Sequence, residues 1–241
     1  MKAAADRITL SPRSARKPGS GPGPRFEDFE RRLLDRFGGP VAGIDEAGRG
    51  PLAGPVSVGI TVFSPELFTP DFCDPEVPGR TPFQGLDDSK KVKPALRNSL
   101  FDTLRRHARF AAAIHISSKL VDGMRISGAL EFAMLRAIAR ADAAGHRPRV
   151  VLIDGNYRLP QVRAQYPDIE IECVVKGDSR VFSIAAASIL AKVSRDRRMA
   201  RYEKLFPGYE LEKHKGYGTV VHRARIRELG PCPIHRRSYS W

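Results

Sequence analysis

The feature of this sequence that most restricts its fold is an alternation of strand-like and helix-like segments. Runs rich in Val and Ile predict strands at 41–45, 55–63, 110–117, 149–154 and 169–175. Apolar residues that recur every three or four positions predict helices at 26–37, 93–107, 127–144 and 179–205. The proline-rich stretch 71–85 is predicted to be loop. Strands separated by helices indicate an α/β fold with a central mixed β-sheet flanked by helices.

The first 25 residues differ in composition from the rest. They are rich in Pro, Gly, Ser and basic residues and lack hydrophobic periodicity, which predicts a disordered basic N-terminal tail. An organelle transit peptide is the alternative, although Pro and Gly disfavour the amphipathic helix that such a signal needs. We expect residues 26–241 to form one domain, since a chain of 241 residues can bury one substantial core.

The charge balance favours a polyanionic partner. Lys and Arg number 41 against 27 Asp and Glu, a formal charge of +14, so nucleic acid is the leading candidate and an anionic membrane surface the lesser one. No apolar run approaches the roughly 20 residues that span a bilayer, and no secretory signal is evident. We therefore predict a cytoplasmic protein without a membrane segment. Its three cysteines are far apart and predict free thiols.

Acidic residues stand where three predicted strands end. Asp45 and Glu46 close the first strand, Asp154 closes another, and Asp178 lies between the last strand and the long helix. Functional groups gather at such positions because the strands hold the loops in place. Four acids in one place would repel each other unless a cation neutralised them, and oxygen ligands alone favour Mg²⁺ or Mn²⁺.

Each acid also has a purely structural interpretation. Asp154-Gly155 is a common turn dipeptide, and Asp178 could cap the helix that follows. Asp45 and Glu46 are adjacent, so on a regular strand they point to opposite faces, and both can serve one site only if the strand distorts or ends there. The glycines that follow permit this, although they are equally consistent with a tight turn.

Five motifs, in order, resemble those of one nuclease family. They are DEAGRGPLAGPV, LDDSKK, LIDGN, KGDSR followed by SIAAASILAKVSRD, and HKGYGT. Over 41–238 the chain closely resembles bacterial ribonuclease HII. Ribonuclease HIII is disfavoured because that family lacks the Arg49 equivalent and carries an extra N-terminal substrate-binding domain. One departure is that the segment 157–168 looks longer than is usual in the family.

The resemblance implies an RNase H-like fold with a helical C-terminal extension. It implies that Asp45, Glu46, Asp154 and Asp178 are both the catalytic residues and the ligands of a two-metal site for Mn²⁺ or Mg²⁺. The implied substrates are RNA/DNA hybrids and duplex DNA with an embedded ribonucleotide, cut on the 5′ side of the ribonucleotide to leave 3′-hydroxyl and 5′-phosphate ends. Such an enzyme must sense the 2′-hydroxyl that marks RNA. The resemblance assigns that role to Gly48, Arg49, Gly50 and Tyr217. We expect a monomer.

Basic residues near these motifs are predicted to contact phosphates, which position a duplex without reading its sequence. They are Lys90, Lys176, Arg180, Lys192 and Lys215. On the long helix, Lys192, Arg195 and Arg197 are expected to face solvent or DNA. His214 could lie near the site, whereas His115, within a strand, is predicted to be packed.

Two other functions fit parts of the pattern. Holliday-junction nucleases and transposase-like enzymes use acids on similar sheets, but they have no need for Arg49 and Tyr217 to detect a 2′-hydroxyl. A non-catalytic nucleic-acid-binding protein would explain the charge, but acids at strand ends would then repel phosphate.

Overall fold

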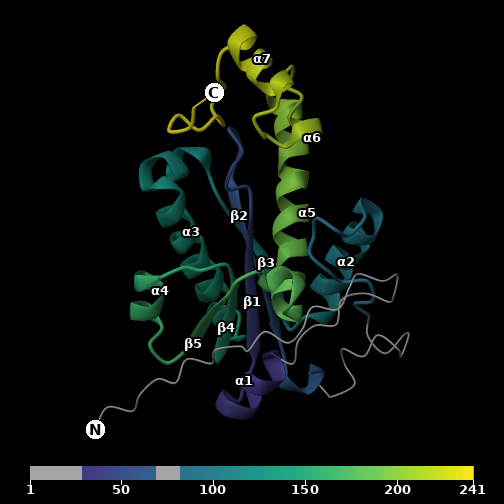
Figure 1. Ribbon diagram of the computed structural model, residues 1–241, viewed down its shortest axis with the longest axis vertical. Coiled ribbons are helices and arrows are strands. Elements are labelled where there is room, and N and C mark those ends of the chain that lie inside the picture. Colours follow the sequence, from purple (N-terminus) through teal and green to yellow (C-terminus); the bar gives the residue numbers. More distant parts are fainter. Residues whose placement is uncertain (1–28, 69–81, 241) are drawn as a thin grey trace.

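A five-stranded mixed sheet forms the centre of the protein. The computed structural model describes residues 29–68 and 82–240 (Figure 1). The strand order is β3-β2-β1-β4-β5, in which β1 pairs antiparallel with β2 and parallel with β4. The strands are β1 (Val41–Ala47), β2 (Val56–Phe63), β3 (Phe110–Ile116), β4 (Val150–Asp154) and β5 (Glu170–Val174). The expected central mixed sheet is confirmed.

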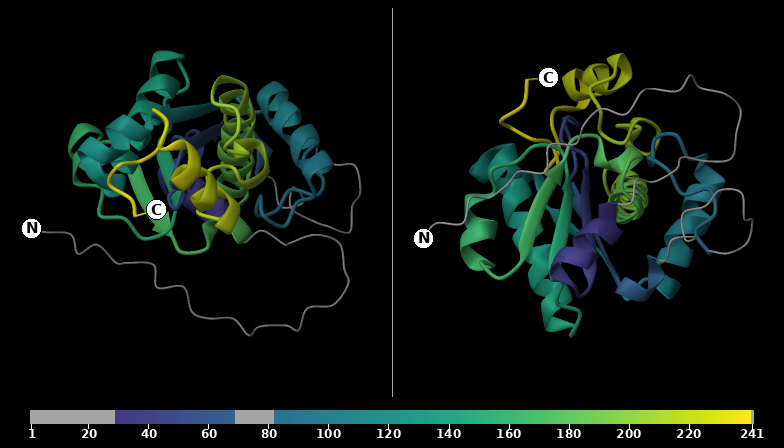
Figure 2. Two further views of the ribbon diagram at one scale, coloured as in Figure 1. Left: turned by 90° about the horizontal axis from the view of Figure 1, so that it is seen from above. Right: turned by 60° about the horizontal axis from the view of Figure 1, so that its bottom comes forward.

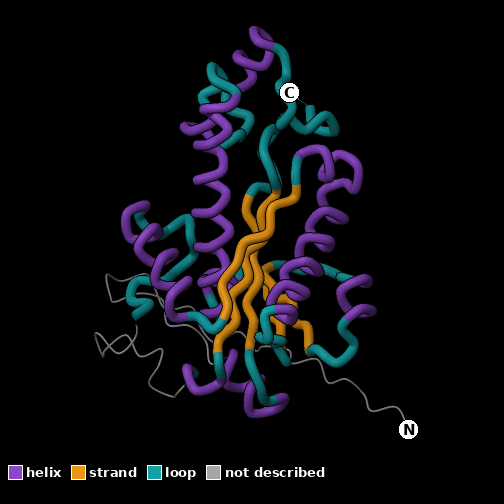
Figure 3. The backbone as a smooth tube through the Cα atoms, turned by 180° about the vertical axis from the view of Figure 1, so that it is seen from behind, coloured by secondary structure: helices purple, strands orange, loops and turns teal. Residues whose placement is uncertain are grey.

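Helices cover both faces of the sheet (Figures 1 and 3). One face carries α1 (Phe29–Phe37), α2 (Pro94–His107) and α5 (Phe182–Leu205), and the other carries α3 (Ser118–Ala143) and α4 (Pro160–Gln165). Along β1 and β4 successive residues alternate between the two cores: Val150 and Leu152 belong to the first, Val151 and Ile153 to the second. This alternation is the period of two that a strand imposes on its side chains.

Helix α5 lies directly against β1 and β2 because two glycines leave room for it. A Cβ on Gly43 would stand 2.0 Å from the carbonyl carbon of Ser183, and one on Gly59 would stand 2.2 Å from the carbonyl oxygen of Ala187. Any side chain at either position would push the helix off the sheet. The contact determines where the segment before α5, which carries Asp178, meets the strand ends.

A C-terminal extension packs beyond the far end of α5. It contains α6 (Leu211–His214) and α7 (Val220–Leu229), and Figure 2 shows it standing above the sheet, where the C-terminus also lies. A small separate core joins α5 to the extension through Met199, Tyr209 and Leu211. The helical extension implied by the resemblance is therefore present.

The predicted elements differ from the observed ones in three places. Helix α3 starts at Ser118 rather than 127, because a first helical stretch is joined to the predicted one across Arg125, whose φ of 60° and ψ of 164° are not helical. The long segment 157–168 contains α4, a helix that was not predicted. The last predicted helix is preceded by a short 3₁₀ turn, η2 (Gly177–Ser179), and begins at Phe182.

Some predictions fall outside the described residues. These include the tail 1–25 and most of the loop 71–85. Within the described part, Cys173 and Cys232 are free thiols, as predicted. Of the helices that the structure describes, none has the length and apolar character needed to cross a membrane.

Candidate active site

The four predicted acids converge on one edge of the sheet. Parallel pairing of β1 with β4 ends at Ile44 opposite Ile153, so Asp45 and Asp154 follow at the same level. The Gly177 amide donates to Oδ1 of Asp154 at 2.7 Å, which ties η2, and with it Asp178, to the end of β4. Side chains from three separate segments thus reach one place.

Asp45 and Glu46 reach this edge without the distortion that the sequence suggested. The antiparallel ladder to β2 continues unbroken through both acids to Ala47. Asp45 shares the α5 face with Gly43, whereas Glu46 shares the α3 face with Ile44. The pairing of β1 with β4 has ended at this level, so β1 has no strand beside it on that side. Asp45 and Glu46 can therefore both face the space beyond the end of β4.

The pKa values reflect this crowding. Asp45 is 7% exposed, and its burial, together with the charges of Glu46, Asp154 and Asp178, holds its pKa well above the ordinary value. Burial also raises the pKa of Asp178, to which the charge of Asp154 adds. Burial raises the pKa of Glu46, although the Arg49 guanidinium opposes the shift. Like charges held in a poorly solvated place create a demand for a cation.

The donor atoms suit a hard divalent cation. All four side chains offer carboxylate oxygens, and Oε2 of Glu46 is buried without a hydrogen-bond partner among the described residues. Oδ1 of Asp45 is engaged by the Glu46 amide at 2.6 Å, which leaves Oδ2 as its available ligand atom. As the side chains stand, no three acidic, imidazole or thiol groups in the described residues are close enough to hold one ion.

Lys90 is the predicted basic residue that meets the acids. Its Nζ lies 3.8 Å from Oδ2 of Asp178. Partial burial would lower the pKa of Lys90, but the charges of Asp88 and the site acids Asp178, Asp45 and Asp154 outweigh this and raise it. Lys90 therefore stays protonated and neutralises part of the acid charge.

The glycine-flanked Arg49 stands beside Glu46. Its Nη1 lies 3.5 Å from Oε1 of Glu46 and donates to the Tyr157 hydroxyl at 3.0 Å. Gly48 has a φ of +92°, and a Cβ there would stand 2.1 Å from Nε of Arg195, so glycine is required. A Cβ on Gly50, by contrast, would meet nothing within 4 Å. The space above Gly50 is open to a ligand.

Sequence reasoning missed the residues that hold this turn. The fully buried Arg236 donates through Nη2 to the Gly48 carbonyl at 2.6 Å, and through Nη1 to the Arg49 carbonyl at 2.8 Å. The Tyr239 hydroxyl also donates to the Arg49 carbonyl, at 2.7 Å. A basic residue near the C-terminus of a basic chain carries no signal of burial. Only its contacts reveal the role.

The prediction for Arg195 is wrong. It was expected to face solvent or DNA, but it is 1% exposed and donates through Nε to the Pro55 carbonyl at 2.9 Å. Its guanidinium carbon lies 6.0 Å from the centre of the Tyr217 ring. Backbone carbonyls provide the polar partners that allow an arginine to be buried here. Arg195 thus links the Gly48 turn to Tyr217, which is 47% exposed.

A group of packed histidines supports the Tyr217 loop from within the extension. His214 stacks on His222 with ring centres 4.2 Å apart, and Nδ1 of His222 contacts the Tyr217 carbonyl at 2.9 Å. Nε2 of His222 lies 3.1 Å from Nε2 of His235. His115 of β3, predicted to be packed, lies between Ser57 of β2 and Ser194 of α5.

Acidification is expected to destabilise this extension. Burial lowers the pKa of His222 to about 4, and burial also lowers the pKa of His235. Below pH 6.5 the unfolded chain binds protons that the folded chain excludes, so the free energy of unfolding falls as pH drops from about 6.5 towards 4. Thermal unfolding measured across this window should show a shallower pH dependence in His222→Gln than in the wild type. The exposed His107→Gln serves as the control; equal slopes in all three proteins would contradict the prediction.

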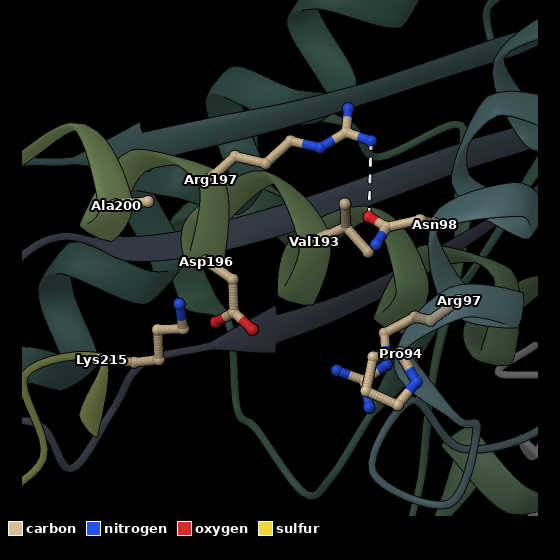
Figure 4. Close-up of a pocket in the computed structure, with 8 residues that line it drawn as sticks. All are labelled: Pro94, Arg97, Asn98, Val193, Asp196, Arg197, Ala200 and Lys215. Carbon is tan, nitrogen blue, oxygen red and sulfur yellow. Dashed lines mark hydrogen bonds between the residues drawn. The ribbon is translucent and has the colours of Figure 1, made fainter. Parts of the chain in front are cut away.

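The other predicted phosphate contacts are spread over a wider surface. Lys176 and Arg180 flank η2, and Arg180 donates to the Val175 carbonyl at 3.2 Å. Lys192 is paired with Asp196 on α5 at 2.9 Å. Lys215 lines a pocket between α2 and α5 (Figure 4). Of the five basic residues, the structure places Lys90 in an ion pair with a site acid.

Comparison with known proteins agrees with this geometry. Residues 42–241 match the family description of ribonuclease HII. The ribonuclease HII of Geobacter sulfurreducens is 42% identical over 219 residues, which cover 90% of each chain. The chain belongs to the ribonuclease HII family. Ribonuclease HII enzymes cleave RNA in RNA/DNA hybrids, so this family member is a ribonuclease H, a nuclease of the hydrolase class.

Solved structures of ribonucleases HII and HIII share the fold. Ribonuclease H2 from Pyrococcus horikoshii superposes with a TM-score of 0.66 at 23% identity, covering 83% of this chain and 94% of its own. Bst-RNase HIII in complex with Mn²⁺ has a TM-score of 0.59 at 18% identity, covering 84% of this chain and 66% of its own. The RNase H-like fold is therefore confirmed for this ribonuclease HII, and enzymes of this group depend on metal.

Proposed function

We propose that this ribonuclease HII hydrolyses the RNA strand of hybrids and also nicks duplex DNA on the 5′ side of embedded ribonucleotides, leaving 3′-hydroxyl and 5′-phosphate ends. The observation that carries the proposal is the convergence of four carboxylates from three segments next to Arg49. The acids would catalyse phosphodiester hydrolysis, and the neighbouring glycine-flanked Arg49 is suited to recognise the ribonucleotide.

In this mechanism Asp45, Glu46, Asp154 and Asp178 would hold two divalent cations, Mn²⁺ or Mg²⁺. When bound, such a pair would supply an activated water and neutralise charge on the leaving 3′ oxygen. The buried Oε2 of Glu46 is ready to accept one ion, and a bound cation would favour the charged form of Asp45, whose pKa is raised by burial and by the neighbouring carboxylates. Lys90, whose Nζ lies 3.8 Å from Oδ2 of Asp178, would neutralise part of the remaining charge.

Recognition of the ribonucleotide is assigned to Gly48, Arg49, Gly50 and Tyr217. The open space above Gly50 lets a sugar approach the backbone closely. Arg236 and Tyr239 hold the Arg49 carbonyl, so the turn is already ordered before a substrate binds. Arg195 contacts both the Tyr217 ring and the backbone that follows the turn, so it would hold Tyr217 and Arg49 in a fixed position relative to each other.

A nicking assay tests the proposal. With Mn²⁺ or Mg²⁺, the purified protein is expected to cut a DNA duplex containing one ribonucleotide on the 5′ side of that residue, and to leave the all-DNA duplex intact. Product ends are identified by their mobility and by ligation. Equal cleavage of the all-DNA duplex would indicate a nuclease of another kind, and binding without cleavage would indicate a non-catalytic nucleic-acid-binding protein.

Tyr217→Ala is expected to slow nicking at a single ribonucleotide by roughly tenfold or more, a loss of about 1.4 kcal/mol in transition-state binding. Stability should change little, because the Tyr217 ring is exposed while its carbonyl and amide contacts remain. kcat/KM and the melting temperature measure the two effects. Val220→Ala, at a nearby side chain that is 83% exposed, is the control. Unchanged kinetics in Tyr217→Ala would remove the ring from recognition.

We further propose that residues 26–241 form the catalytic unit and that the enzyme acts as a monomer in the cytoplasm. The four acids, Arg49 and Tyr217 all come from one chain, so the proposed site is complete without a residue from a second copy.

A further inference from the structure

A pocket separate from the acids lies between α2, α5 and the turn that follows α6. Its volume is about 340 Å³, and its walls include Arg97 and Asn98 from α2, Asp196 and Arg197 from α5, and Lys215. Figure 4 shows Arg197 on one side of Val193 and Lys215 with Asp196 on the other. Three cationic side chains and one acid therefore line a hollow of a size that admits a small anionic group.

The single acid in the pocket is already neutralised. Asp196 accepts from Nζ of Lys192 at 2.9 Å, so the lining carries a surplus of positive charge. Arg97 donates through Nη2 to the Val92 carbonyl at 2.8 Å, but its Nε is shielded from solvent and has no hydrogen-bond partner among the described residues. A buried donor without a partner is costly unless a ligand or water supplies an acceptor.

Arg197 is held in a fixed orientation at the pocket. Its guanidinium carbon lies 4.4 Å from the centre of the Phe101 ring, and Nη2 donates to the Asn98 side chain at 3.4 Å. Nη2 of Arg197 also lies 4.0 Å from the exposed carboxylate of Asp102, but this contact is too long and too solvated to neutralise the Arg197 charge strongly. A guanidinium held in this way keeps N–H groups for in-plane hydrogen bonds to phosphate oxygens.

Two of the segments that line the pocket, α2 and the turn after α6, lie next in sequence to the predicted substrate-binding residues Lys90 and Tyr217. Helix α2 starts four residues after Lys90, whose loop is tied to α5 by the Ser89 amide and the Ser188 hydroxyl at 3.3 Å. Lys215 stands two residues before Tyr217. None of the four site acids lines the pocket, so it is separate from the proposed cutting site.

From these observations we infer that this pocket binds a phosphate of the nucleic-acid backbone, at a distance from the bond that is cut. Arg97 and Arg197 supply the hydrogen bonds and Lys215 adds charge. The inference rests on the proposed function and extends it: the acids and Arg49 determine where the strand is cut, and the pocket anchors the duplex in position.

The test compares Arg197→Gln and Arg97→Gln with Arg136→Gln. Arg136 is an exposed arginine over the Phe132 ring of α3, on the opposite face of the sheet, so its loss removes the same charge without touching the pocket. For the pocket variants KM on a ribonucleotide-containing duplex is expected to rise about tenfold, with kcat within about twofold. The slope of log affinity against log salt should become less steep by about 0.9. Arg197→Lys should keep that slope, because it keeps the charge.

A phosphate scan locates the contact. Single methylphosphonates placed along both strands should weaken wild-type binding at one position, measured by fluorescence anisotropy in EDTA, and this penalty should disappear in Arg197→Gln. If Arg197→Gln matches Arg136→Gln in KM, salt slope and scan, the inference is wrong. Failure of the wild type to nick the duplex would instead overturn the proposed function, because the binding measurement requires no cleavage. Melting temperatures equal to the wild type exclude misfolding as the cause.

Discussion

Replacing Asp45 by asparagine is expected to abolish nicking, with a loss on the order of 10³-fold or more in kcat. Asp45 is the acid most deeply surrounded by the others: burial and the charges of Glu46, Asp154 and Asp178 all act on it. Asparagine keeps the shape and the Oδ1 contact to the Glu46 amide, but it lacks the charge that a divalent cation needs. The assay is single-turnover nicking at saturating Mn²⁺.

The same substitution is expected to stabilise the metal-free protein. Because the pKa of Asp45 is raised in the folded state, the folded chain binds its proton more tightly than the unfolded chain does. Stability is therefore lost as pH rises from the ordinary aspartate pKa through the raised one, so above this pH window Asp45 destabilises the metal-free fold. In EDTA, Asp45→Asn should melt a few degrees higher than the wild type. For a domain of this size, a change of about 1 kcal/mol in the free energy of unfolding shifts the melting temperature by roughly 2–4 °C.

Added Mn²⁺ should reverse this order, since a ligand that binds only the folded state stabilises the wild type more than the variant. Asp35→Asn, on the exposed side of α1, should change neither activity nor melting temperature. Retained activity in folded Asp45→Asn would remove this residue from the site. A lower melting temperature in EDTA would show that its carboxylate is a structural acceptor rather than a strained ligand.

Arg236→Met is expected to cause the largest loss of stability of any single change considered. The side chain is fully buried and donates to the carbonyls of Gly48, Arg49 and Gly54. Methionine fills the volume but leaves the buried carbonyl oxygens of Gly48 and Gly54 without this donor, at about 1–3 kcal/mol for each group left unsatisfied, whereas the Arg49 carbonyl keeps the Tyr239 hydroxyl. The free energy of unfolding should fall by roughly 3–5 kcal/mol, measured by urea denaturation.

Activity should fall in Arg236→Met even where the protein is folded, because the turn that positions Arg49 loses its support. Arg237→Met is the matched control: its side chain is exposed, and its amide contact to Asp122 does not depend on the side chain. The control should keep wild-type stability and nicking. If Arg236→Met unfolded at the same urea concentration as Arg237→Met, the buried contacts would contribute little, and the turn would have to be held by Tyr239 and Arg195.

The acid cluster was predictable because it depends on local patterns. An apolar strand that ends on an acid is visible in a sequence, and parallel neighbouring strands bring their ends to one edge. Asp154 and Asp178 illustrate this: Asp154 ends β4, Asp178 follows β5, and a hydrogen bond from the Gly177 amide to Asp154 joins their two segments. The difficulty over adjacent Asp45 and Glu46 was resolved by tertiary structure instead. The strand stays regular, and the space opens because β4 ends beside it.

The boundary of helix α3 was predicted wrongly because local patterns do not show how two helical stretches join. Helix α3 was expected to begin at the start of its apolar stripe, but its first part is capped by the Ser117 side chain and joined across Arg125. A single residue with φ of 60° is not encoded by periodicity, since left-handed backbone is rare for arginine. Packing of the surrounding helix against the sheet must offset its cost.

By itself, the sequence determined the layered fold and the nuclease family, and it singled out the four acids as candidates, because period, strand ends and motifs are properties of short segments. Tertiary structure alone decided which arginines are buried. Arg195 and Arg236 look like surface charges in the sequence, yet backbone carbonyls of the glycine-rich turn satisfy both. Whether a charged side chain is buried depends on partners distant in the chain: Gly48 lies 188 residues before Arg236. That contact, rather than any motif, holds the turn that carries Arg49 in place.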